Sequence, residues 1–356
     1  MMKFDFCIGN PPYQEEKIGD NDGFAPPVYN KFLDAAFEVA DKVEMIHPAR
    51  FLFNAGSTPK AWNEKMLNDN HFKVLEYRED ASTVFTNTDI KGGVAITYRN
   101  ANESYGSIGI FTPYEEVNSI LNRVKKALES GNIADIGVSG YSYHFTELMH
   151  KENPDIMKAT IVVDGKERPL LSKGHEYDLK SNIINKLPGI FLDTKPNDGN
   201  EYIIIIGREN NERVSKYIKK NYINEVINLK CYKLLIPKAS GIGAFGEILG
   251  PSIIAEPNVG HTETFFSIGK FNTEIEAKNL YKYLKGKFAR TLLSVLKKTQ
   301  NITPGNFAYI PLQDFTDKSD INWNTSISNI DKQLYKKYGL TDEEIAFIET
   351  NVKEME

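Results

Sequence analysis

Cysteine and histidine are both scarce in this chain of 356 residues, which has two cysteines and six histidines. Cys7 and Cys231 are too few for a disulfide framework and suit a reducing compartment, so we expect a cytoplasmic protein. The histidines are scattered and lack the spacing of metal ligands. We therefore expect neither a disulfide-rich secreted protein nor a metal site.

Long apolar segments are also missing. No apolar run approaches the roughly 18–20 residues needed to span a bilayer. The first ten residues, "MMKFDFCIGN", lack the apolar stretch and the cleavage site of a signal peptide. We expect no membrane partner. The net charge of −5 does not decide about nucleic acid, because the distribution of charge matters more than its total.

The first hundred residues alternate strand-like and helix-like segments. "FDFCIGN" (4–10) predicts a strand buried on both faces that ends at Gly9. Apolar residues between 29 and 40 recur with the period of one helix face. The order suggests part of a mostly parallel sheet covered by helices, in an α/β fold. The other segments expected here are strands at 43–53, 72–77 and 92–99 and a polar helix at 59–69.

From about residue 105 the pattern changes to short β-like runs separated by loops rich in Gly, Asn and Pro. Two short helices are expected at the end of the chain. Ser328 is the expected cap of the first, which stops at Gly339, and Thr341 with Glu344 forms a capping box for the second. Strands are expected at 202–207, 230–237 and 251–256, and helices at 113–129 and 274–298. We expect three regions, 1–105, 106–325 and 326–356.

The sequence "NPPY" at 10–13 follows the first predicted strand directly. Pro11 and Pro12 have no N–H to donate and restrict the backbone. The side-chain oxygen of Asn10 and the main-chain oxygen of Pro11 can then converge as two acceptors. Such a pair fits an amino group on a planar ring, and Tyr13 offers a face for that ring. Ligands also bind at the carboxyl ends of strands in open α/β sheets. For two prolines alone, a tight turn is the alternative.

These four residues resemble the catalytic motif of S-adenosylmethionine-dependent methyltransferases that act on planar amino nitrogens. In DNA methyltransferases of this kind, the target adenine is flipped out of the duplex. The resemblance implies that Asn10 and Pro11 bind the exocyclic amine and that Tyr13 stacks on the base. Accepting both amine hydrogens directs the nitrogen lone pair towards the methyl donor, so no histidine or other base is needed.

A second segment, "VFTNTDIKGGVAITY" (84–98), resembles the part of these enzymes in which a phenylalanine packs on the other side of the base. Phe85 is the candidate, and a core phenylalanine in a loop is the alternative. Segments such as "LIPKASGIGAFGEIL" (235–249) resemble the C-terminal half of adenine-specific methylases from restriction–modification systems. The resemblance implies a partial Rossmann-like methyltransferase sheet lacking its first strands, followed by a mixed α+β target-recognition domain.

The S-adenosylmethionine site is expected to be incomplete in this chain. In the family's usual order a Gly-rich turn precedes "NPPY", whereas only three residues precede Phe4 here. In a permuted order "GIGAFG" (241–246) is a candidate, but Gly250-Pro251 interrupts the helix that must follow, which favours a hairpin or DNA-facing loop. We expect 4–8 to form an unpaired apolar edge. The chain is then a C-terminal fragment or half of a split enzyme, whose partner is an N-terminal methyltransferase half or a restriction subunit.

Basic residues crowd the predicted helix at 274–298 and suggest contacts with the phosphates of double-stranded DNA. Lys238 and Ser240 are weaker candidates. A solvated helix face is the alternative for any single lysine. The candidates on the helix are Lys278, Lys282, Lys285, Lys287, Arg290, Lys297 and Lys298.

The sequence therefore predicts an adenine-specific DNA methyltransferase of a restriction–modification system, in which a target-recognition domain accounts for the long second part of the chain. No convincing nuclease motif of the PD…(D/E)xK type accompanies it. Two alternatives remain open. The same motif serves methyltransferases of release-factor glutamines or RNA bases, and the chain could instead be a non-catalytic specificity module or an inactive remnant.

Overall fold

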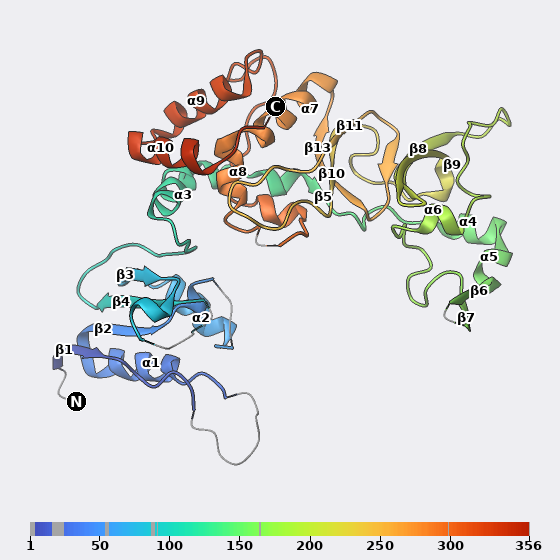
Figure 1. Ribbon diagram of the computed structural model, residues 1–356. Helices are drawn as coiled ribbons and strands as arrows, with labels where there is room; N and C mark the ends of the chain where they lie inside the picture. Colours follow the sequence, from blue (N-terminus) through green and yellow to red (C-terminus); the bar gives the residue numbers. More distant parts are fainter. Residues whose placement is uncertain are drawn as a thin grey trace. The chain divides into compact units, whose positions relative to one another are not determined.

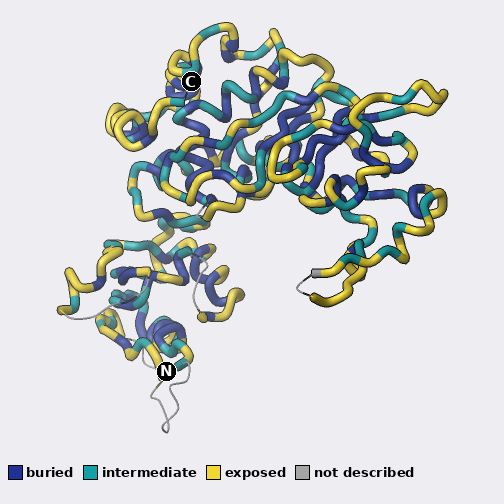
Figure 2. The backbone as a smooth tube through the Cα atoms, turned by 45° about the vertical axis from the view of Figure 1, so that its right-hand side comes forward, coloured by how far each residue is buried: buried dark blue, intermediate teal, exposed yellow. Residues whose placement is uncertain are grey.

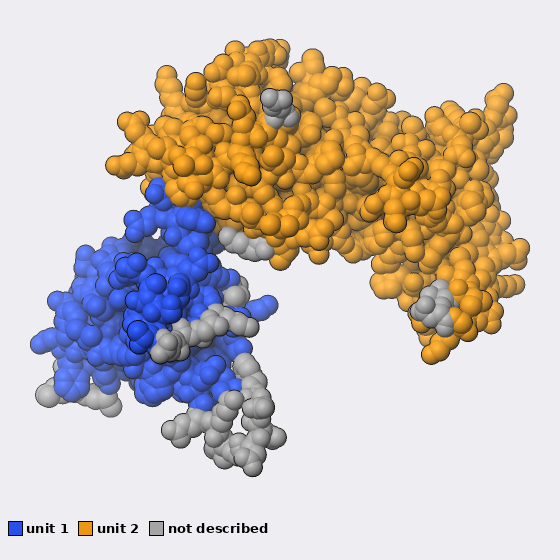
Figure 3. Space-filling model, viewed as in Figure 1, with its two compact units in different colours: residues 1–118 blue, residues 119–356 orange. Residues whose placement is uncertain are grey.

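The computed structural model describes residues 4–15, 25–53, 57–86, 90, 92–163, 165–297 and 299–355. By its contacts the chain divides into two compact units, Met1–Asn118 and Ser119–Glu356 (Figure 3). Helices and several separate sheets make it a mixed α/β protein (Figure 1). No helix among these residues is long and apolar enough to cross a membrane. The same residues contain no group of three or more His, Cys, Asp or Glu side chains that could hold a metal ion.

Unit 1 is built on a four-stranded sheet in the order β1-β2-β4-β3. β1 and β2 are parallel, because α1 provides the crossover between them. β4 follows β3 directly and lies between β3 and β2, antiparallel to both. Of the described strands of this sheet, β1, β2 and β3 therefore run in the same direction and β4 runs against them, so the expected parallel arrangement holds for all but β4. The elements are β1 (Phe4–Gly9), α1 (Tyr29–Val39), β2 (Ala40–Pro48), α2 (Lys60–Leu67), β3 (Phe72–Arg78) and β4 (Val94–Asn100).

One face of this sheet forms the core of unit 1. Leu33 of α1 and Met66 of α2 are fully buried in one cluster with Val43 of β2 (Figure 2). β1 lies at the edge of the sheet and pairs only with β2 among the described strands. On its other face, Phe4, Phe6 and Ile8 are 60%, 47% and 72% exposed. The prediction of a strand buried on both faces is wrong, and β1 is the expected apolar edge.

Three further sheets lie in unit 2, in the orders β11-β10-β13-β5, β12-β8-β9 and β6-β7. The strands are β5 (Gly137–Val138), β6 (Thr160–Val163), β7 (Lys166–Pro169), β8 (Tyr202–Glu209), β9 (Glu212–Lys219), β10 (Tyr232–Pro237), β11 (Ile253–Ala255), β12 (Val259–His261) and β13 (Phe265–Phe271). The helices of the remaining chain are α3 (Glu115–Leu128), α4 (Glu147–Glu152), α5 (Pro154–Lys158), α6 (Ile183–Lys186), α7 (Glu274–Lys285), α8 (Lys287–Leu293), α9 (Ile327–Tyr338) and α10 (Asp342–Asn351).

The predicted helix at 274–298 is two helices, because the chain breaks at Gly286 between α7 and α8. A Cβ at Gly286 would lie 2.6 Å from a carboxylate oxygen of Asp331 in α9. That carboxylate accepts hydrogen bonds from the N–H groups of Lys287 and Phe288, at 2.8 and 3.1 Å. Asp331 thus caps the amino end of α8, where Gly286 has no side chain to do so.

The last two helices agree with prediction except at one cap. Ser326, and not Ser328, caps α9 by accepting the N–H of Asn329. Gly339 ends α9 in the left-handed conformation, as predicted, and Thr341 with Glu344 forms the predicted capping box of α10. Side chains from both helices are fully buried in the cluster that also contains α7 and α8, so by packing 326–356 shares the core of unit 2.

Candidate active site

Asn10 directly follows Gly9, the last residue of β1, which is paired with β2. Gly9 pairs with Met45, and a Cβ at Gly9 would lie 3.1 Å from the sulfur of Met45. Asn10 is exposed, whereas Pro11 is buried. Neither the Asn10 amide nor the Pro11 carbonyl has a hydrogen-bond partner within the described part of the chain. The two acceptors that are predicted to act together thus belong to consecutive residues, and no hydrogen bond from the described residues occupies either of them.

The segment after Asn10 is fixed by the residues that lead into α1. The carbonyl of Tyr13 accepts the N–H of Val28 at 3.1 Å. The N–H of Glu15 donates to the carbonyl of Pro26 at 3.0 Å, and its carboxylate pairs with Lys31 of α1 at 2.9 Å. The "NPPY" segment is therefore held between the end of β1 and the start of α1, which restricts the positions of both acceptors.

Tyr13 and Phe85 lie together although they are far apart in the sequence. Their ring centroids are 6.4 Å apart, with an interplanar angle of 70°, so the contact is edge to face. A flat base between two parallel rings needs a separation of about 7 Å, twice the usual carbon–carbon contact. The edge-to-face contact leaves no such slot, so the Phe85 ring has to turn before a base can lie between the two. Both predicted stacking residues are thus adjacent, in a closed arrangement.

The hydroxyl group of Tyr13 is the unusual feature of this contact. It is buried and has no hydrogen-bond partner among the residues that the structure describes, and burial raises the pKa of Tyr13. Buried polar groups without partners are rare, because desolvation is then uncompensated. The hydroxyl is therefore a group for which the described residues supply no acceptor or donor.

His47 is the histidine of β2, and it belongs to the core. It is fully buried, its Nε2 lies 2.7 Å from the Thr97 hydroxyl, and its ring stacks on Tyr29 at 5.6 Å. Burial lowers the pKa of His47 to about 4, so the ring is neutral at pH 7. Tyr29 is the first residue of α1. His47 thus supports the start of the helix that holds Tyr13.

The glycine-rich segment 241–246 does not fit S-adenosylmethionine. A helix would have to follow the glycines, and β11 follows instead. The carboxylate of Glu247 accepts the N–H groups of Ile242 and Gly243, at 2.8 and 3.0 Å, and it pairs with Lys297. The backbone donors that a nucleotide needs are therefore taken by the protein's own side chain. The interpretation as a glycine-rich loop is the one that the structure supports.

Most of the basic candidates for DNA contact interact with other residues of the protein. Arg290 is 1% exposed and donates to the carbonyls of Lys285, Gly246 and Lys353. Lys297 is 2% exposed and pairs with Glu247. Such buried groups cannot reach a phosphate in this arrangement. Of the others, Lys278 pairs with Glu274, Lys282 donates to the Trp323 carbonyl, Lys287 pairs with Glu349, Lys285 lies 5.4 Å from the Tyr281 ring, and Lys298 lies outside the described residues.

The two weaker candidates differ from each other. Ser240 is 4% exposed, and its hydroxyl accepts the N–H of Gly250 at 2.7 Å, so its role is structural. Lys238 is half-buried, and its ammonium group donates to the hydroxyl of Tyr141 at 2.8 Å. Lys238 is not ion-paired among the described residues. Like Lys285, it is therefore a predicted cation that is available to an anion.

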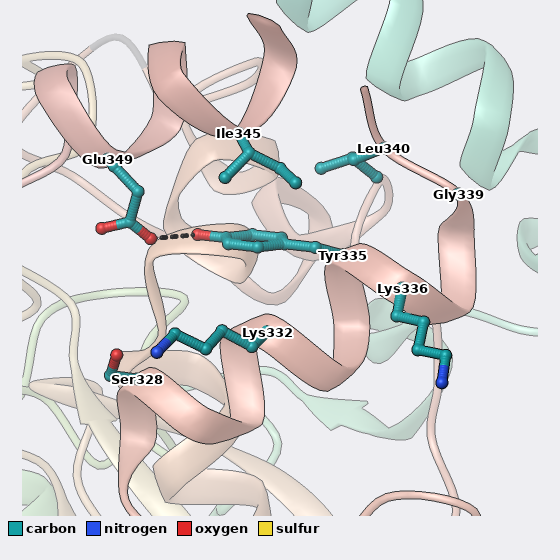
Figure 4. A pocket seen from close by; sticks show the side chains of 8 residues that line it. All are labelled: Ser328, Lys332, Tyr335, Lys336, Gly339, Leu340, Ile345 and Glu349. Atoms are coloured by element: carbon teal, nitrogen blue, oxygen red, sulfur yellow. Dashed lines mark hydrogen bonds between the residues drawn. The ribbon is translucent and has the colours of Figure 1, made fainter. Parts of the chain in front are cut away.

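Two of the hollows on the protein surface help to place the site. One of about 480 Å³ lies on the open face of the sheet of unit 1, beside the segment that carries Phe85. Its lining residues are Ile46, Glu76, Arg78, Thr83, Val84, Val94 and Ile96. A larger one, of about 710 Å³, lies between α9 and α10 (Figure 4). It contains none of the predicted site residues. Figure 4 shows Tyr335 crossing it to donate to Glu349 at 2.8 Å.

Comparisons with known proteins concern mainly the N-terminal region. The family model described as Eco57I restriction-modification methylase matches residues 1–85. An "uncharacterized adenine-specific methylase" of Mycoplasma pneumoniae (strain ATCC 29342 / M129) is 31% identical over 96 residues. That match covers 26% of this chain and 23% of the relative, so the chain spans less than a quarter of the curated protein it resembles. Residues 1–85, which contain "NPPY" and end at Phe85, are thus similar to restriction–modification methylases.

Among solved structures, the type IIG restriction endonuclease BpuSI is similar at 11% sequence identity with a TM-score of 0.32. The superposition covers 93% of this chain and 48% of that one. A TM-score of this size does not establish a common fold.

Proposed function

We propose that this chain carries the acceptor-base part of an adenine-specific DNA methyltransferase of a restriction–modification system. The observation that carries the proposal is the pair of unused acceptors, Asn10 and Pro11, at the carboxyl end of the parallel strand β1. The similarity of residues 1–85 to restriction–modification methylases supports it. In this proposal unit 2 recognises double-stranded DNA, and the sheet of unit 1 is part of a Rossmann-like methyltransferase sheet.

The roles of the individual residues follow from their chemistry. The Asn10 side-chain oxygen and the Pro11 carbonyl accept the two hydrogens of the adenine amine. This draws the nitrogen lone pair out of conjugation with the ring, so no side chain has to remove a proton first. Pro12 has no N–H to compete for these acceptors. Tyr13 lies against one face of the extruded base, and Phe85 turns to cover the other.

Methyltransferases generally take their methyl group from S-adenosylmethionine, and the glycine-rich loop of unit 2 does not fit that cofactor. We propose that an N-terminal methyltransferase half completes the cofactor site. Two features of β1 support this. Its outer edge is unpaired among the described strands, so its N–H and C=O groups can bind a further strand. Phe4, Phe6 and Ile8 also present an exposed apolar surface that such a half would cover.

The test is a methyl-transfer assay on mixed genomic DNA, with the full chain alone and with a candidate N-terminal half supplied. We expect transfer to adenine in the reconstituted enzyme. Asn10→Ala should lower the rate on the order of 100-fold, which is the scale for losing one aligned hydrogen-bond group in an active site. Asn70→Ala is the matched control, because Asn70 is an exposed asparagine in the turn between α2 and β3.

Two results would contradict the proposal. If the Asn10→Ala enzyme transferred methyl groups as fast as the Asn70→Ala enzyme, the assignment of the acceptor would be wrong. If the chain bound DNA but no preparation methylated any DNA, even with the N-terminal half supplied, the non-catalytic specificity module would be the better description.

A further inference from the structure

Two arginines face each other across the β8–β9 hairpin without a balancing negative charge. Arg208 pairs directly with Arg213 in the register of the two strands. The turn between them consists of Asn210 and Asn211, both with positive φ, which is typical of a two-residue hairpin. Like charges directly opposite on one face of a sheet are destabilising. The arrangement therefore needs either an internal partner or an external anion.

No internal carboxylate balances this pair. Glu209 and Glu212 occupy the alternate positions of the hairpin, so their side chains leave the opposite face. Glu209 also pairs with Lys216 at 2.8 Å. The structure records neither Arg208 nor Arg213 in an ion pair within its described part.

The guanidinium groups are fixed in place but mostly unused. Arg208 donates to the carbonyl of Asn211 at 2.7 Å, and Arg213 donates to that of Pro251 at 3.2 Å. The Arg213 guanidinium also lies 5.2 Å from the ring of Phe265. Both arginines are exposed. A guanidinium has five N–H donors, so each group keeps most of its donors for an anion from outside.

Phe265, which is itself buried, links the hairpin to the neighbouring sheet. The two sheets pack together in one apolar cluster that includes Ile206 and Phe265, and Figure 1 shows β8 and β9 beside β10 and β13. Phe265 pairs with Pro237, and the next residue is Lys238. The Lys238 ammonium lies 4.6 Å from the centre of the Tyr141 ring. Arg213 thus lies against Phe265, and Lys238 follows the residue that pairs with Phe265 and is not ion-paired among the described residues.

Tyr141 gives this surface an exposed aromatic ring. It is 46% exposed, although its backbone is held closely against β13. A Cβ at the preceding Gly140 would lie 2.5 Å from the carbonyl oxygen of Phe265, so only glycine permits this approach. The ring is therefore presented to solvent from a fixed position. We call Tyr141, Arg208, Arg213 and Lys238 the hairpin surface.

We infer that the hairpin surface binds the phosphate backbone of double-stranded DNA, an inference that rests on the proposed function of unit 2. Arginine matches phosphate with two parallel hydrogen bonds, and phosphates beside Arg208 and Arg213 remove the repulsion between them. Lys238 supplies a third cation. Tyr141 supplies a hydroxyl and a flat face, which suit phosphate and sugar groups. The sequence prediction placed the DNA contacts mainly at 274–298, whereas these side chains come from β8, β9 and two loops. The sequence signal for them was the hairpin "RENNER" (208–213).

The test measures binding of the full chain to a fluorescently labelled DNA duplex of mixed sequence, between about 50 and about 200 mM salt. Each phosphate contact contributes about 0.9 to the slope of log K against log salt. Arg208→Ala with Arg213→Ala should therefore make that slope less negative by about 2. Binding at low salt should weaken by at least tenfold, which is on the order of what the loss of two such contacts gives.

Two further variants separate charge from structure. Arg208→Lys with Arg213→Lys keeps both charges and should retain most of the slope. Arg168→Ala removes an exposed arginine from β7, on a separate hairpin, and should leave slope and affinity unchanged. If the double alanine variant does not fold by circular dichroism, Lys238→Ala provides the same test from the neighbouring sheet. Its expected change in slope is about 1.

The outcome of this test is separate from that of the proposed function, because binding needs no methyl donor. The inference is overturned if the wild-type chain shows no salt-dependent binding of duplex DNA. It is also overturned if the folded alanine variants keep the wild-type slope. A chain that binds through the hairpin surface but methylates no DNA would contradict the proposed methyl transfer and leave this surface standing.

Discussion

Single polar groups without partners define the candidate site at the residue scale. The Asn10 amide belongs to an exposed residue, so water can satisfy it, whereas Pro11 is buried. The hydroxyl of Tyr13 is different, because it is buried and unpaired. An acceptor that is hydrogen-bonded to water does not lower the stability of the fold, whereas a buried hydroxyl without a partner does. Tyr13 therefore retains a group that the described structure does not use.

Replacing Tyr13 by phenylalanine separates the effect of its hydroxyl on stability from the effect of its ring. Tyr13→Phe should raise the free energy of unfolding of unit 1 by about 1 kcal/mol, because it removes an unsatisfied buried group and keeps the ring. Tyr13→Ala should lower it, since the contact with Phe85 is lost. Urea unfolding followed by Trp62 fluorescence measures both, because Trp62 is the tryptophan of unit 1. A destabilised Tyr13→Phe variant would show that the hydroxyl has a partner after all.

At the same scale, residue type was enough to choose a candidate site but did not reveal exposure. Asn10 to Tyr13 were chosen as candidates from their order alone, because two prolines between an amide and an aromatic are a specific combination. Arg290 and Lys238 looked alike as cations in the sequence. One is buried with three backbone carbonyls, and the other is half-buried beside a tyrosine. The difference depends on Gly246, on Lys353 after α10 and on Tyr141, whose positions no local pattern reveals.

At the element scale, the junction between α7 and α8 depends on a residue from a third helix. Asp331 of α9 caps α8, and Gly286 leaves room for its carboxylate. Asp331→Ala should lower the free energy of unfolding of unit 2 by about 1–2 kcal/mol, the usual effect of losing a cap. Gly286→Ala should lower it by about 1–3 kcal/mol, because the added methyl group displaces the carboxylate.

The double variant decides whether the two effects share this cause. In the Asp331→Ala background the added methyl group at Gly286 meets no carboxylate, so its effect should be clearly smaller. Denaturant unfolding followed by Trp323 fluorescence measures the cycle. Additive effects would mean that Gly286 is required for another reason, such as its backbone conformation.

Local patterns predicted elements well and their pairing poorly. The helix at 29–39 and the capping box at Thr341 follow from residues within one or two turns. The sheet order does not, because β4 inserts between β2 and β3 and reverses the expected direction. The break between two helices at Gly286 was not predicted either, since the basic residues on both sides suggested a single helix. The residue that caps the new helix after Gly286 is Asp331, which lies 45 positions further along the chain than Gly286.

At the scale of the whole molecule, each unit has a core with one fully buried histidine and one tryptophan. His47 and Trp62 belong to unit 1, and His261 and Trp323 belong to unit 2. Burial lowers the pKa of both histidines to about 4, against 6.5 in an unfolded chain. Between these values the unfolded chain binds more protons than the folded one. Each histidine therefore contributes stability that is present above about pH 6.5 and lost as the pH falls towards about 4.

We expect each histidine to control the acid sensitivity of its own unit. The difference in pKa corresponds to about 3 kcal/mol for each fully buried ring. His47→Gln stays neutral and can still bond to Thr97, so it should remove about that much of the pH dependence of unit 1. His261→Gln should do the same for unit 2. In unit 2 the dependence of the free energy of unfolding on pH combines two opposite effects. His261 lowers the stability as the pH falls, whereas Asp331 raises it, because burial raises the pKa of Asp331 to about 6.

Single-tryptophan variants allow each unit to be followed separately. Trp323→Phe leaves Trp62 as the reporter of unit 1, and Trp62→Phe leaves Trp323 for unit 2. Urea unfolding from pH 6.5 to 4.5 should then show that His47→Gln flattens only the Trp62 curve. Because the buried side chains of the two units form separate clusters, the Trp323 curve should stay as it was. If His47→Gln changed both curves equally, the two units would unfold as one, and the separation into two independently stable units would be wrong.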